Sequence, residues 1–314
     1  MARIAIIGCG LIGRAWTISF LRGGHKVALW DADADAPTRL HDNLPESFED
    51  LRSHGLLSEE TGPMLARLIT CTRLEDAVAG AVHVQENTSE ILETKRALFA
   101  QLDTACAPET VLASSTSGLL PSKIFEGMAD AHRGLVAHPI NPPYLIPAVE
   151  IVPGPDTTRQ VIAQTAELFK SLGQAPIIMA RELDGFLMNR LQGALLDEAF
   201  RLVDQGYASA EDVDIGIREG LALRWSFMGP FETIDLNAPE GVRDYTERYA
   251  QMYQTIFATL PVRPDWTGPV LSQIEQERRH ALPHENLMQR QAWRDRRLMA
   301  LIEHKTNADK EFGK

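Results

Sequence analysis

The chain has 314 residues, 43 of them acidic and 31 basic, so its formal net charge is −12. At roughly 100–200 residues per domain, this length predicts about two domains, each large enough to bury a core. A pI near 5.2 argues against a nucleic-acid-binding face, because clustered Lys and Arg are needed to neutralise phosphates. The N-terminus has no long apolar stretch and no run of ~18 apolar residues occurs, so we expect neither a secretory leader nor a membrane span.

The cysteine content points to a reducing compartment. Cys9, Cys71 and Cys106 form an odd set at spacings that match neither a disulfide framework nor a zinc site. We therefore expect free thiols, no bound metal and a cytoplasmic location.

The first 180 residues alternate short apolar runs with segments of helical spacing. Near-continuous apolar strands separated by helices predict a mostly parallel sheet covered on both faces. The predicted strands are Arg3–Gly8, Lys26–Trp30, Val82–Gln85, Val111–Ser114, Leu135–His138, Val149–Val152 and Ala175–Met179. The predicted helices of this region include Ala15–Leu21, Ile91–Leu102 and Thr157–Leu172.

A glycine-rich turn connects the first strand to the first helix. Gly8, Gly10 and Gly13, with Cys9, Leu11 and Ile12 between them, form the pattern G-x-G-x-x-G in a strand–turn–helix setting. The glycines permit a tight turn, close approach of the backbone to a pyrophosphate and close helix–strand packing. Asp31, at the end of the second strand, is placed to bind the ribose hydroxyls, which favours NAD over NADP. FAD uses the same fingerprint, but the sequence shows no second cofactor motif for it. The sequence thus predicts a Rossmann-type, doubly wound α/β domain that binds NAD.

The pattern changes near residue 183, beyond which the sequence indicates helices alone. Met188, Leu191, Leu195, Ala199 and Leu202 are spaced to form one apolar stripe on a long helix. Further helices are predicted over 209–221, 239–259, 269–281 and 284–304, followed by a frayed tail after Asn307. We therefore predict an NAD-binding domain over 1–183 and an all-α domain for substrate binding and dimerisation over 184–314.

A histidine and a glutamate are the leading candidates for catalysis. His138 stands at the carboxyl end of a predicted strand, where ligands bind in doubly wound sheets. Glu150 interrupts an apolar strand, and an unpaired buried carboxylate is costly. An imidazole is the economical partner, so the two side chains are expected to form a general acid/base pair.

Hydroxyl side chains follow another predicted strand. The run Ser114–Ser117 is placed either to bind a substrate oxygen or to cap the helix that follows. The sequence leaves both interpretations open.

Five stretches together resemble the 3-hydroxyacyl-CoA dehydrogenase superfamily: Gly8–Gly13, Ser114–Ser117, His138–Pro142, Glu150 and Asp184–Arg190. Within it, the chain is most similar to the λ-crystallin / L-gulonate 3-dehydrogenase branch. This narrower resemblance is carried by His138–Glu150, Leu223–Glu232, Asp244–Tyr249 and Trp293–Asp295. The resemblance covers essentially the whole chain.

The resemblance implies a role for individual residues. His138 would be the catalytic acid/base and Glu150 its partner, while Ser117 and Asn189 would bind the reacting hydroxyl or carbonyl. Asn141 would position the nicotinamide or the substrate, and Glu90 and Lys95 would line the nicotinamide side of the cofactor site. The run 87–89 (Asn-Thr-Ser) departs from many relatives. The C-terminal helices are expected to form a homodimer.

The charge pattern bears on the substrate. Residues 35–60 hold seven acidic side chains and two arginines, in a region that helps to hold the CoA nucleotide in this superfamily. Such a surface would repel an acyl-CoA, which favours a small free acid, although a solvated acidic helix face is the alternative. A free carboxylate requires a cation, and Arg224 and then Arg190 are the candidates, with Trp225 as a wall of the pocket.

The leading hypothesis is an NAD-dependent enzyme that oxidises the 3-hydroxyl of a small hydroxy acid, with L-gulonate as substrate. L-Carnitine is a close alternative, because aromatic rings such as Trp225 or Tyr249 would suit its trimethylammonium group. 3-Hydroxybutyryl-CoA is the third. A structural NAD-binding protein without turnover is the alternative outside the enzymes.

Overall fold

A computed structural model describes residues 1–258, 265 and 267–313 of the chain. It contains two compact units. The first consists of Met1–Arg190 together with Arg294–Lys314, and the second of Leu191–Trp293.

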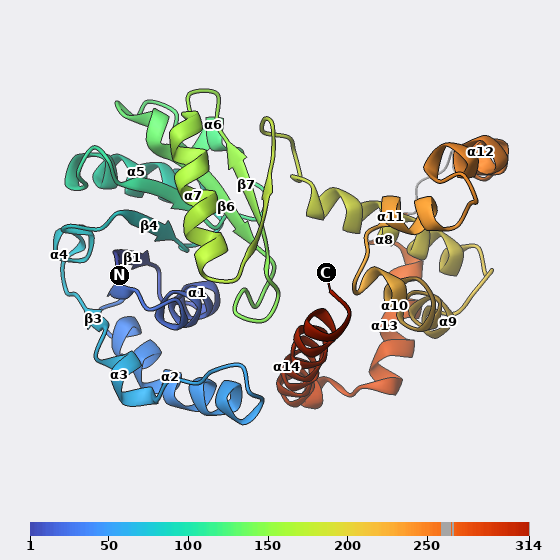
Figure 1. Cartoon of the computed structure of the whole chain (residues 1–314), viewed down its shortest axis with the longest axis horizontal. Coiled ribbons are helices and arrows are strands. Elements are labelled where there is room, and N and C mark those ends of the chain that lie inside the picture. Colours follow the sequence, from blue (N-terminus) through green and yellow to red (C-terminus); the bar gives the residue numbers. More distant parts are fainter. Residues whose placement is uncertain (259–264, 266, 314) are drawn as a thin grey trace. The chain divides into compact units, whose positions relative to one another are not determined.

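An eight-stranded sheet forms the centre of the first unit (Figure 1). Its spatial order is β3-β2-β1-β4-β5-β6-β7-β8, and all neighbours are parallel except β6 and β7. Chain order reverses beside β1, whose two neighbours are β2 and β4; this switch point is where doubly wound sheets bind their ligands. The strands are β1 (Arg3–Ile7), β2 (Lys26–Trp30), β3 (Leu68–Thr70), β4 (His83–Glu86), β5 (Val111–Ser114), β6 (Gly134–Pro139), β7 (Ala148–Pro153) and β8 (Ala175–Ile178).

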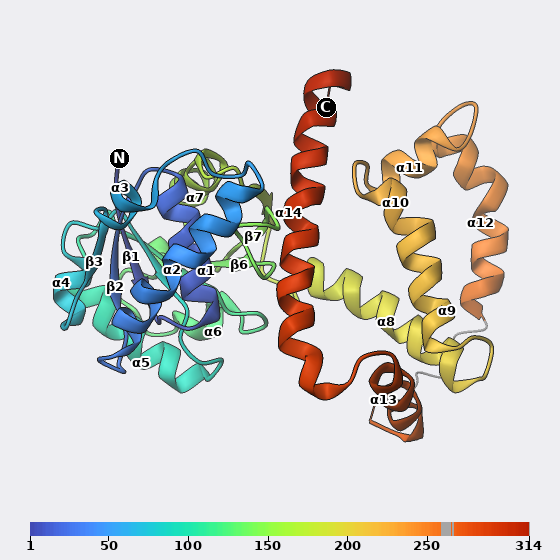
Figure 2. The same cartoon turned by 90° about the horizontal axis from the view of Figure 1, so that it is seen from below.

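Helices cover both faces of this sheet. In β1, Ile4 and Ile6 belong to one apolar core, while Ala5 and Ile7 belong to the other, as the two-residue period of a strand requires. The first core includes residues of α1 (Leu11–Arg22), α2 (Ala36–Ser53), α7 (Arg159–Ser171) and α14 (Leu287–Phe312). The second includes residues of α4 (Leu74–Val78), α5 (Leu92–Ala105) and α6 (Pro121–Ile124). Figure 2 shows α1 and α2 on one side of the strands and α4 and α5 on the other.

The second unit is helical throughout its described residues. Its elements are the greater part of α8 (Met188–Asp204), α9 (Ala210–Ile215), a π-helical segment (Gly216–Leu221), α10 (Ala222–Trp225), α11 (Pro230–Leu236), α12 (Val242–Ala258) and α13 (Pro269–Ala281). On α8, Leu191 and Leu195 of the predicted apolar stripe are exposed. No helix built from the described residues combines the length and the apolar character needed to cross a membrane.

The predicted fold class is confirmed: a mostly parallel, Rossmann-like sheet is followed by a helical region. Three details were wrong or missed. The short edge strand β3 was not predicted, and the frayed tail after Asn307 was wrong because α14 continues to Phe312. Arg294–Lys314 pack with the first unit, whereas the prediction assigned all of 184–314 to the second domain. Residue 259 of the predicted helix 239–259 lies outside the described residues.

The glycine turn is tightly packed at two of its three glycines. A Cβ on Gly13 would lie 1.9 Å from the carbonyl oxygen of Gly8. Gly8 has φ +93°, and its own Cβ would lie 2.8 Å from the backbone of Asn87. Gly10 differs, because its φ is −71° and no atom lies within 4 Å of the place of a Cβ. Gly8 and Gly13 are thus required by packing and Gly10 is not.

This difference gives a matched pair of variants. Gly13→Ala is expected to lower the melting temperature by at least about 4 °C, because the turn has to open to admit the methyl group. Gly10→Ala should melt within about 1 °C of the wild type, since an exposed alanine fits its backbone conformation. Differential scanning calorimetry of both variants measures this, and equal melting temperatures would show that the packing argument is wrong.

Candidate active site

The glycine turn and the end of β2 form one part of the site. Gly10 precedes α1, and no side chain caps this end of the helix. The first amides of a helix have no partner inside it, so they are available to a phosphate group. The open space at Gly10 allows the close approach that such a group needs.

Asp31 lies beside this turn at the carboxyl end of the sheet. Its carboxylate accepts hydrogen bonds from the amides of Cys9, at 2.7 Å, and Asp33, at 2.9 Å. Burial, and then the charge of Asp31, raise the pKa of the Cys9 thiol to about 12, so Cys9 carries no charge at neutral pH. The turn thus presents neutral amides to a phosphate, and a fixed carboxylate lies next to them.

A cavity of about 160 Å³ opens over the same turn. It is lined by Cys9, Gly10, Leu11, Arg14, Ala36, Arg39, Leu40 and Asn43. Its arginines suit a phosphate, and its apolar side chains suit a base. These residues fit the adenosine diphosphate half of a dinucleotide, which Gly10 to Gly13 and Asp31 would hold.

The reversed strand β7 brings His138 and Glu150 together. The two residues are opposite partners in the antiparallel ladder of β6 and β7. His138 Nδ1 lies 2.6 Å from Glu150 Oε2, and both side chains are buried. The predicted contact between these side chains is therefore present in the fold. Because Nδ1 is engaged, Nε2 is the ring nitrogen that is left for a substrate.

The second oxygen of Glu150 is fixed by the chain that enters α8. Oε1 accepts the amide hydrogens of Leu187, at 2.6 Å, and Met188, at 2.8 Å. Burial by itself would raise the pKa of Glu150, but the hydrogen bonds from His138, Met188 and Leu187 together hold this pKa below its usual value. Glu150 is thus an ionised carboxylate at neutral pH.

Two unusual backbone conformations shape this entry to α8. Gly185 has φ +76° and Phe186 has φ +49°, the latter rare for a residue with a side chain. Phe186 is fully buried, and its ring centroid lies 5.5 Å from that of His138. The turn therefore places an aromatic ring against the imidazole and aims two amides at Glu150.

The structure distinguishes the members of the serine and threonine run. Ser114 donates to Glu86 at 2.6 Å, and Ser115 receives hydrogen bonds from Trp16 and Gln85. Thr116 donates to Glu90, and no side chain caps α6. Ser117 is exposed, and its hydroxyl has no hydrogen bond within the described part of the chain. Thr116 Oγ1 also accepts the amide of Leu119 at 3.0 Å, so this hydroxyl closes the turn that leads to α6. Both interpretations of the run therefore stay predictions, and Ser117 is the member whose hydroxyl is left for a ligand.

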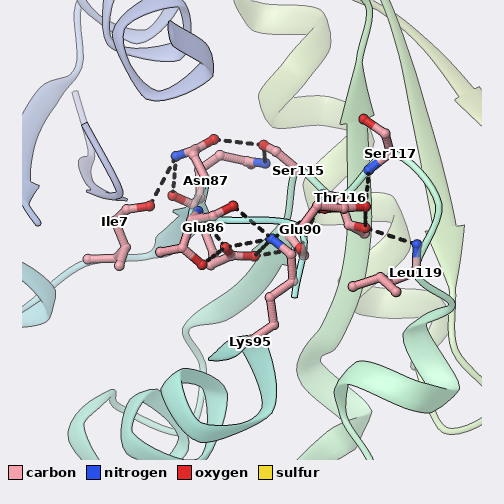
Figure 3. A network of polar contacts seen from close by, with 12 residues as sticks. Ile7, Glu86, Asn87, Glu90, Lys95, Ser115, Thr116, Ser117 and Leu119 are labelled. Carbon is pink, nitrogen blue, oxygen red and sulfur yellow. Dashed lines mark hydrogen bonds and ion pairs between the residues drawn. The ribbon is translucent and has the colours of Figure 1, made fainter. Parts of the chain in front are cut away.

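Glu90 and Lys95 belong to a polar network between β4, α5 and the loop after β5 (Figure 3). The network also contains Glu86, a buried residue at the end of β4 that sequence reasoning missed. The signal available was a glutamate directly after an apolar strand, nine residues before a lysine. Its interpretation required knowing that both side chains are buried.

The remaining predicted residues of the first unit lie at different distances from this centre. Asn189, in the first turn of α8, donates from Nδ2 to the carbonyl of Ser117 at 2.6 Å. Asn141 is exposed in the loop between β6 and β7. Arg190 is also exposed, and its hydrogen bond to the carbonyl of Asp184 is long at 3.4 Å. Asn189 thus joins the site directly, whereas Asn141 and Arg190 lie at its surface.

Arg224 and Trp225 belong to α10 of the second unit. Trp225 is 40% exposed. The Nε of Arg224 is buried and has no hydrogen-bond partner among the described residues. The same is true of the Nε atoms of Arg3, Arg52, Arg67 and Arg133, so this feature does not distinguish Arg224, which stays a prediction of the sequence. Within the described ranges, no three His, Cys, Asp or Glu side chains gather as a metal site.

Comparisons with known proteins agree with this geometry. Residues 3–183 match the family model for the NAD binding domain of 3-hydroxyacyl-CoA dehydrogenase, and residues 185–263 match that for its C-terminal domain. The λ-crystallin homolog of Bos taurus is 42% identical over 306 residues, which cover 96% of this chain and 95% of that protein. The L-carnitine dehydrogenase of Streptomyces coelicolor is also 42% identical, over 76% of this chain and 74% of that protein.

A solved structure extends the likeness to three dimensions. It is a 5-formyl-3-hydroxy-2-methylpyridine 4-carboxylic acid 5-dehydrogenase, described as an NAD+ dependent dismutase. The TM-score is 0.82 at 27% identity, over 96% of this chain and 97% of the other. The predicted cofactor, NAD, agrees with the family model and with this relative. On these matches, the chain belongs to the 3-hydroxyacyl-CoA dehydrogenase family and is an NAD-binding oxidoreductase.

Proposed function

We propose that this protein oxidises the 3-hydroxyl of a small hydroxy acid to a ketone with NAD, and that L-gulonate is its first candidate substrate. The observation that carries the proposal is the contact between His138 and Glu150 at the edge of the sheet. A buried imidazole with one nitrogen fixed and the other left for a substrate is suited to general acid/base work.

The chemistry divides between the cofactor and the chain. NAD, when bound, supplies the hydride acceptor. His138 Nε2 removes the proton of the substrate hydroxyl, and Glu150 stabilises the imidazolium that results. Ser117 and Asn189 hold the reacting oxygen. In the reverse direction the imidazolium returns the proton.

The assignment of His138 predicts a selective loss of turnover. His138→Gln should lower kcat at least ~100-fold, while the dissociation constant for NADH stays within about twofold of the wild type. NADH fluorescence measures the binding, and absorbance of the reduced cofactor measures the rate. His132→Gln, at an exposed histidine of the same unit, is the matched control and should retain wild-type activity. Near-normal turnover of His138→Gln would falsify the proposed role.

The choice of a free acid depends on the charges around the acidic stretch and in the second unit. The acidic stretch 35–60 receives cations that its sequence does not contain: Arg67 pairs with Glu59, and Arg296 lies 3.9 Å from Asp50. This region therefore repels a CoA nucleotide less than its composition indicates. Arg224, whose guanidinium can bind a carboxylate through two N–H groups, is the candidate cation for a free acid.

L-Carnitine is the second candidate, and it also carries a carboxylate. The identity to L-carnitine dehydrogenases favours it. Tyr245 and Tyr249 add an aromatic pair on α12, with ring centroids 4.7 Å apart, and aromatic faces attract quaternary ammonium groups. Both candidate substrates therefore need a site for a carboxylate, and only L-carnitine also needs aromatic side chains for its trimethylammonium group.

A substrate panel tests the choice. Purified protein with NAD is offered L-gulonate, L-carnitine and 3-hydroxybutyryl-CoA, and we expect the highest kcat/KM with L-gulonate. Arg224→Met should raise KM for L-gulonate at least ~10-fold, because a charge-assisted pair is lost. Arg218→Met, at an exposed arginine of the same unit, is the control. A preference for the thioester contradicts the free acid, and tight NADH binding without any turnover supports the structural, non-enzymatic alternative.

The proposal includes a homodimer formed through the second unit; a cytoplasmic location stays a prediction. Many large apolar side chains of this unit are exposed in the single chain, and contiguous exposed apolar surface is typical of an interface. They include Leu191, Leu195, Leu223, Phe227, Phe231, Leu236, Val242 and Met252. Light scattering is expected to give twice the chain mass of 34.8 kDa, and a lower mass for Phe227→Asp. A wild-type mass of one chain contradicts the dimer.

A further inference from the structure

The carboxylate of Glu86 is buried at the end of β4 and surrounded by donors. Its exposed fraction is 0%. Oε2 accepts from the hydroxyl of Ser114 at 2.6 Å, and Oε1 accepts from the amide and the hydroxyl of Thr88, both at 2.6 Å. Lys95 Nζ lies 2.8 and 3.0 Å from the two oxygens. Figure 3 shows these contacts converging between β4 and α5. These donors together fix the position of the Glu86 carboxyl group.

The ammonium of Lys95 is buried and contacts only protein atoms among the described residues. Its side chain is 1% exposed, and besides Glu86 its Nζ contacts the carbonyl of Thr88 at 3.3 Å. The Oε2 of Glu90 lies 3.7 Å away. Lys95 therefore stands between two carboxylates and offsets their repulsion. With its three donor directions facing protein atoms, this ammonium acts on the site through Glu86 and Glu90.

Glu90 connects the buried Glu86–Lys95 pair with the loop after β5. Its side chain is 47% exposed. Its Oε1 accepts hydrogen bonds from the hydroxyl of Thr116, the amide of Ser117 at 2.9 Å and the amide of Gly118 at 3.1 Å. One carboxylate oxygen thus holds three consecutive residues of the loop.

Ser117 lies between this anchor and the acid/base pair. Its amide is bound by Glu90, its carbonyl accepts the side-chain amide of Asn189, and its hydroxyl remains exposed. Asn189 follows Met188, whose own amide binds Glu150. Both backbone groups of Ser117 are therefore bound, the amide by Glu90 and the carbonyl by Asn189, and the side-chain hydroxyl remains for a ligand.

We propose that Glu90 is a positioning residue that fixes the hydroxyl of Ser117 for the reacting oxygen of the substrate, and that the buried Glu86–Lys95 pair holds Glu90 in place. The inference rests on the proposed function, because it assigns the hydroxyl of Ser117 to the substrate. Without Lys95, the carboxylate of Glu90 is no longer held by an ammonium, and its repulsion by Glu86 is no longer offset. Being half exposed, it turns to solvent and releases the loop.

A double-mutant cycle tests the connection between Glu90 and Ser117. Glu90→Gln is expected to lower kcat about tenfold, because the loop loses its charged acceptor. In the Ser117→Ala background the same substitution should lower kcat by less than about twofold, since the group it positions is already absent. Glu93→Gln, at an exposed glutamate three residues further along in the first turn of α5, is the control and should leave kcat unchanged.

Hydrogen exchange supplies a measurement that does not need turnover. In the free protein, Glu90→Gln should speed exchange of the Ser117 and Gly118 amides at least about tenfold, while the strands keep their protection. Lys95→Met alone leaves a buried charge and risks unfolding, so Glu86→Gln/Lys95→Met removes both charges together. This double variant should speed exchange at the same two amides.

The outcomes separate the two proposals. Unchanged exchange in Glu90→Gln shows that Glu90 does not hold the loop and overturns the inference. Faster exchange with multiplicative effects on kcat shows that Glu90 acts independently of Ser117, which also overturns it. Wild-type protein that turns over no substrate of the panel contradicts the proposed function and with it the role of Ser117, while the exchange experiment still decides whether the loop is tethered.

Discussion

The antiparallel pairing of β6 and β7 is the constraint on which the rest of the site depends. His138 stands near the end of its strand and Glu150 near the beginning of the next. Two such positions lie at the same edge of a sheet only when the second strand runs in the opposite direction. The reversal places the two residues directly opposite each other. One change of strand direction thus brings two positions 12 residues apart into a buried hydrogen bond.

Glu150 also ties the sheet to the segment that leaves it. The amides of Leu187 and Met188 donate hydrogen bonds to its carboxylate. The positive φ angles of Gly185 and Phe186 turn the chain so that these amides point toward Glu150. The same turn presses Phe186 against the imidazole and begins the helix that carries Asn189. Residues 184–190 therefore connect the two units and complete the acid/base pair at once. A substitution in this segment therefore alters the contacts that position His138, even where the substituted residue touches no substrate.

The pattern of apolar and charged residues along the chain explains which strands and site residues could be predicted. The inner strands were found because burial on both faces makes them continuous apolar runs, whereas β3 has three residues and two of them are exposed. The pairing of His138 with Glu150 followed from the cost of a buried carboxylate. The same reasoning did not find Glu86, because Lys95 is spaced like a surface residue of α5 and its burial depends on the packing of the sheet. Met299 illustrates a further limit, since its contact with the first core joins distant parts of the chain.

A shared device holds the carboxylates along this edge of the sheet. Asp31 accepts the amides of Cys9 and Asp33, Glu90 those of Ser117 and Gly118, and Glu150 those of Leu187 and Met188. In each case the backbone amides of a loop donate hydrogen bonds to a carboxylate of the protein itself. An amide donor to a charged acceptor is a stronger bond than one between neutral groups, so the loops are fixed before any ligand arrives. Lys95, the buried cation among these carboxylates, is bound to Glu86, so its charge is used inside the fold and is not available to an anionic substrate.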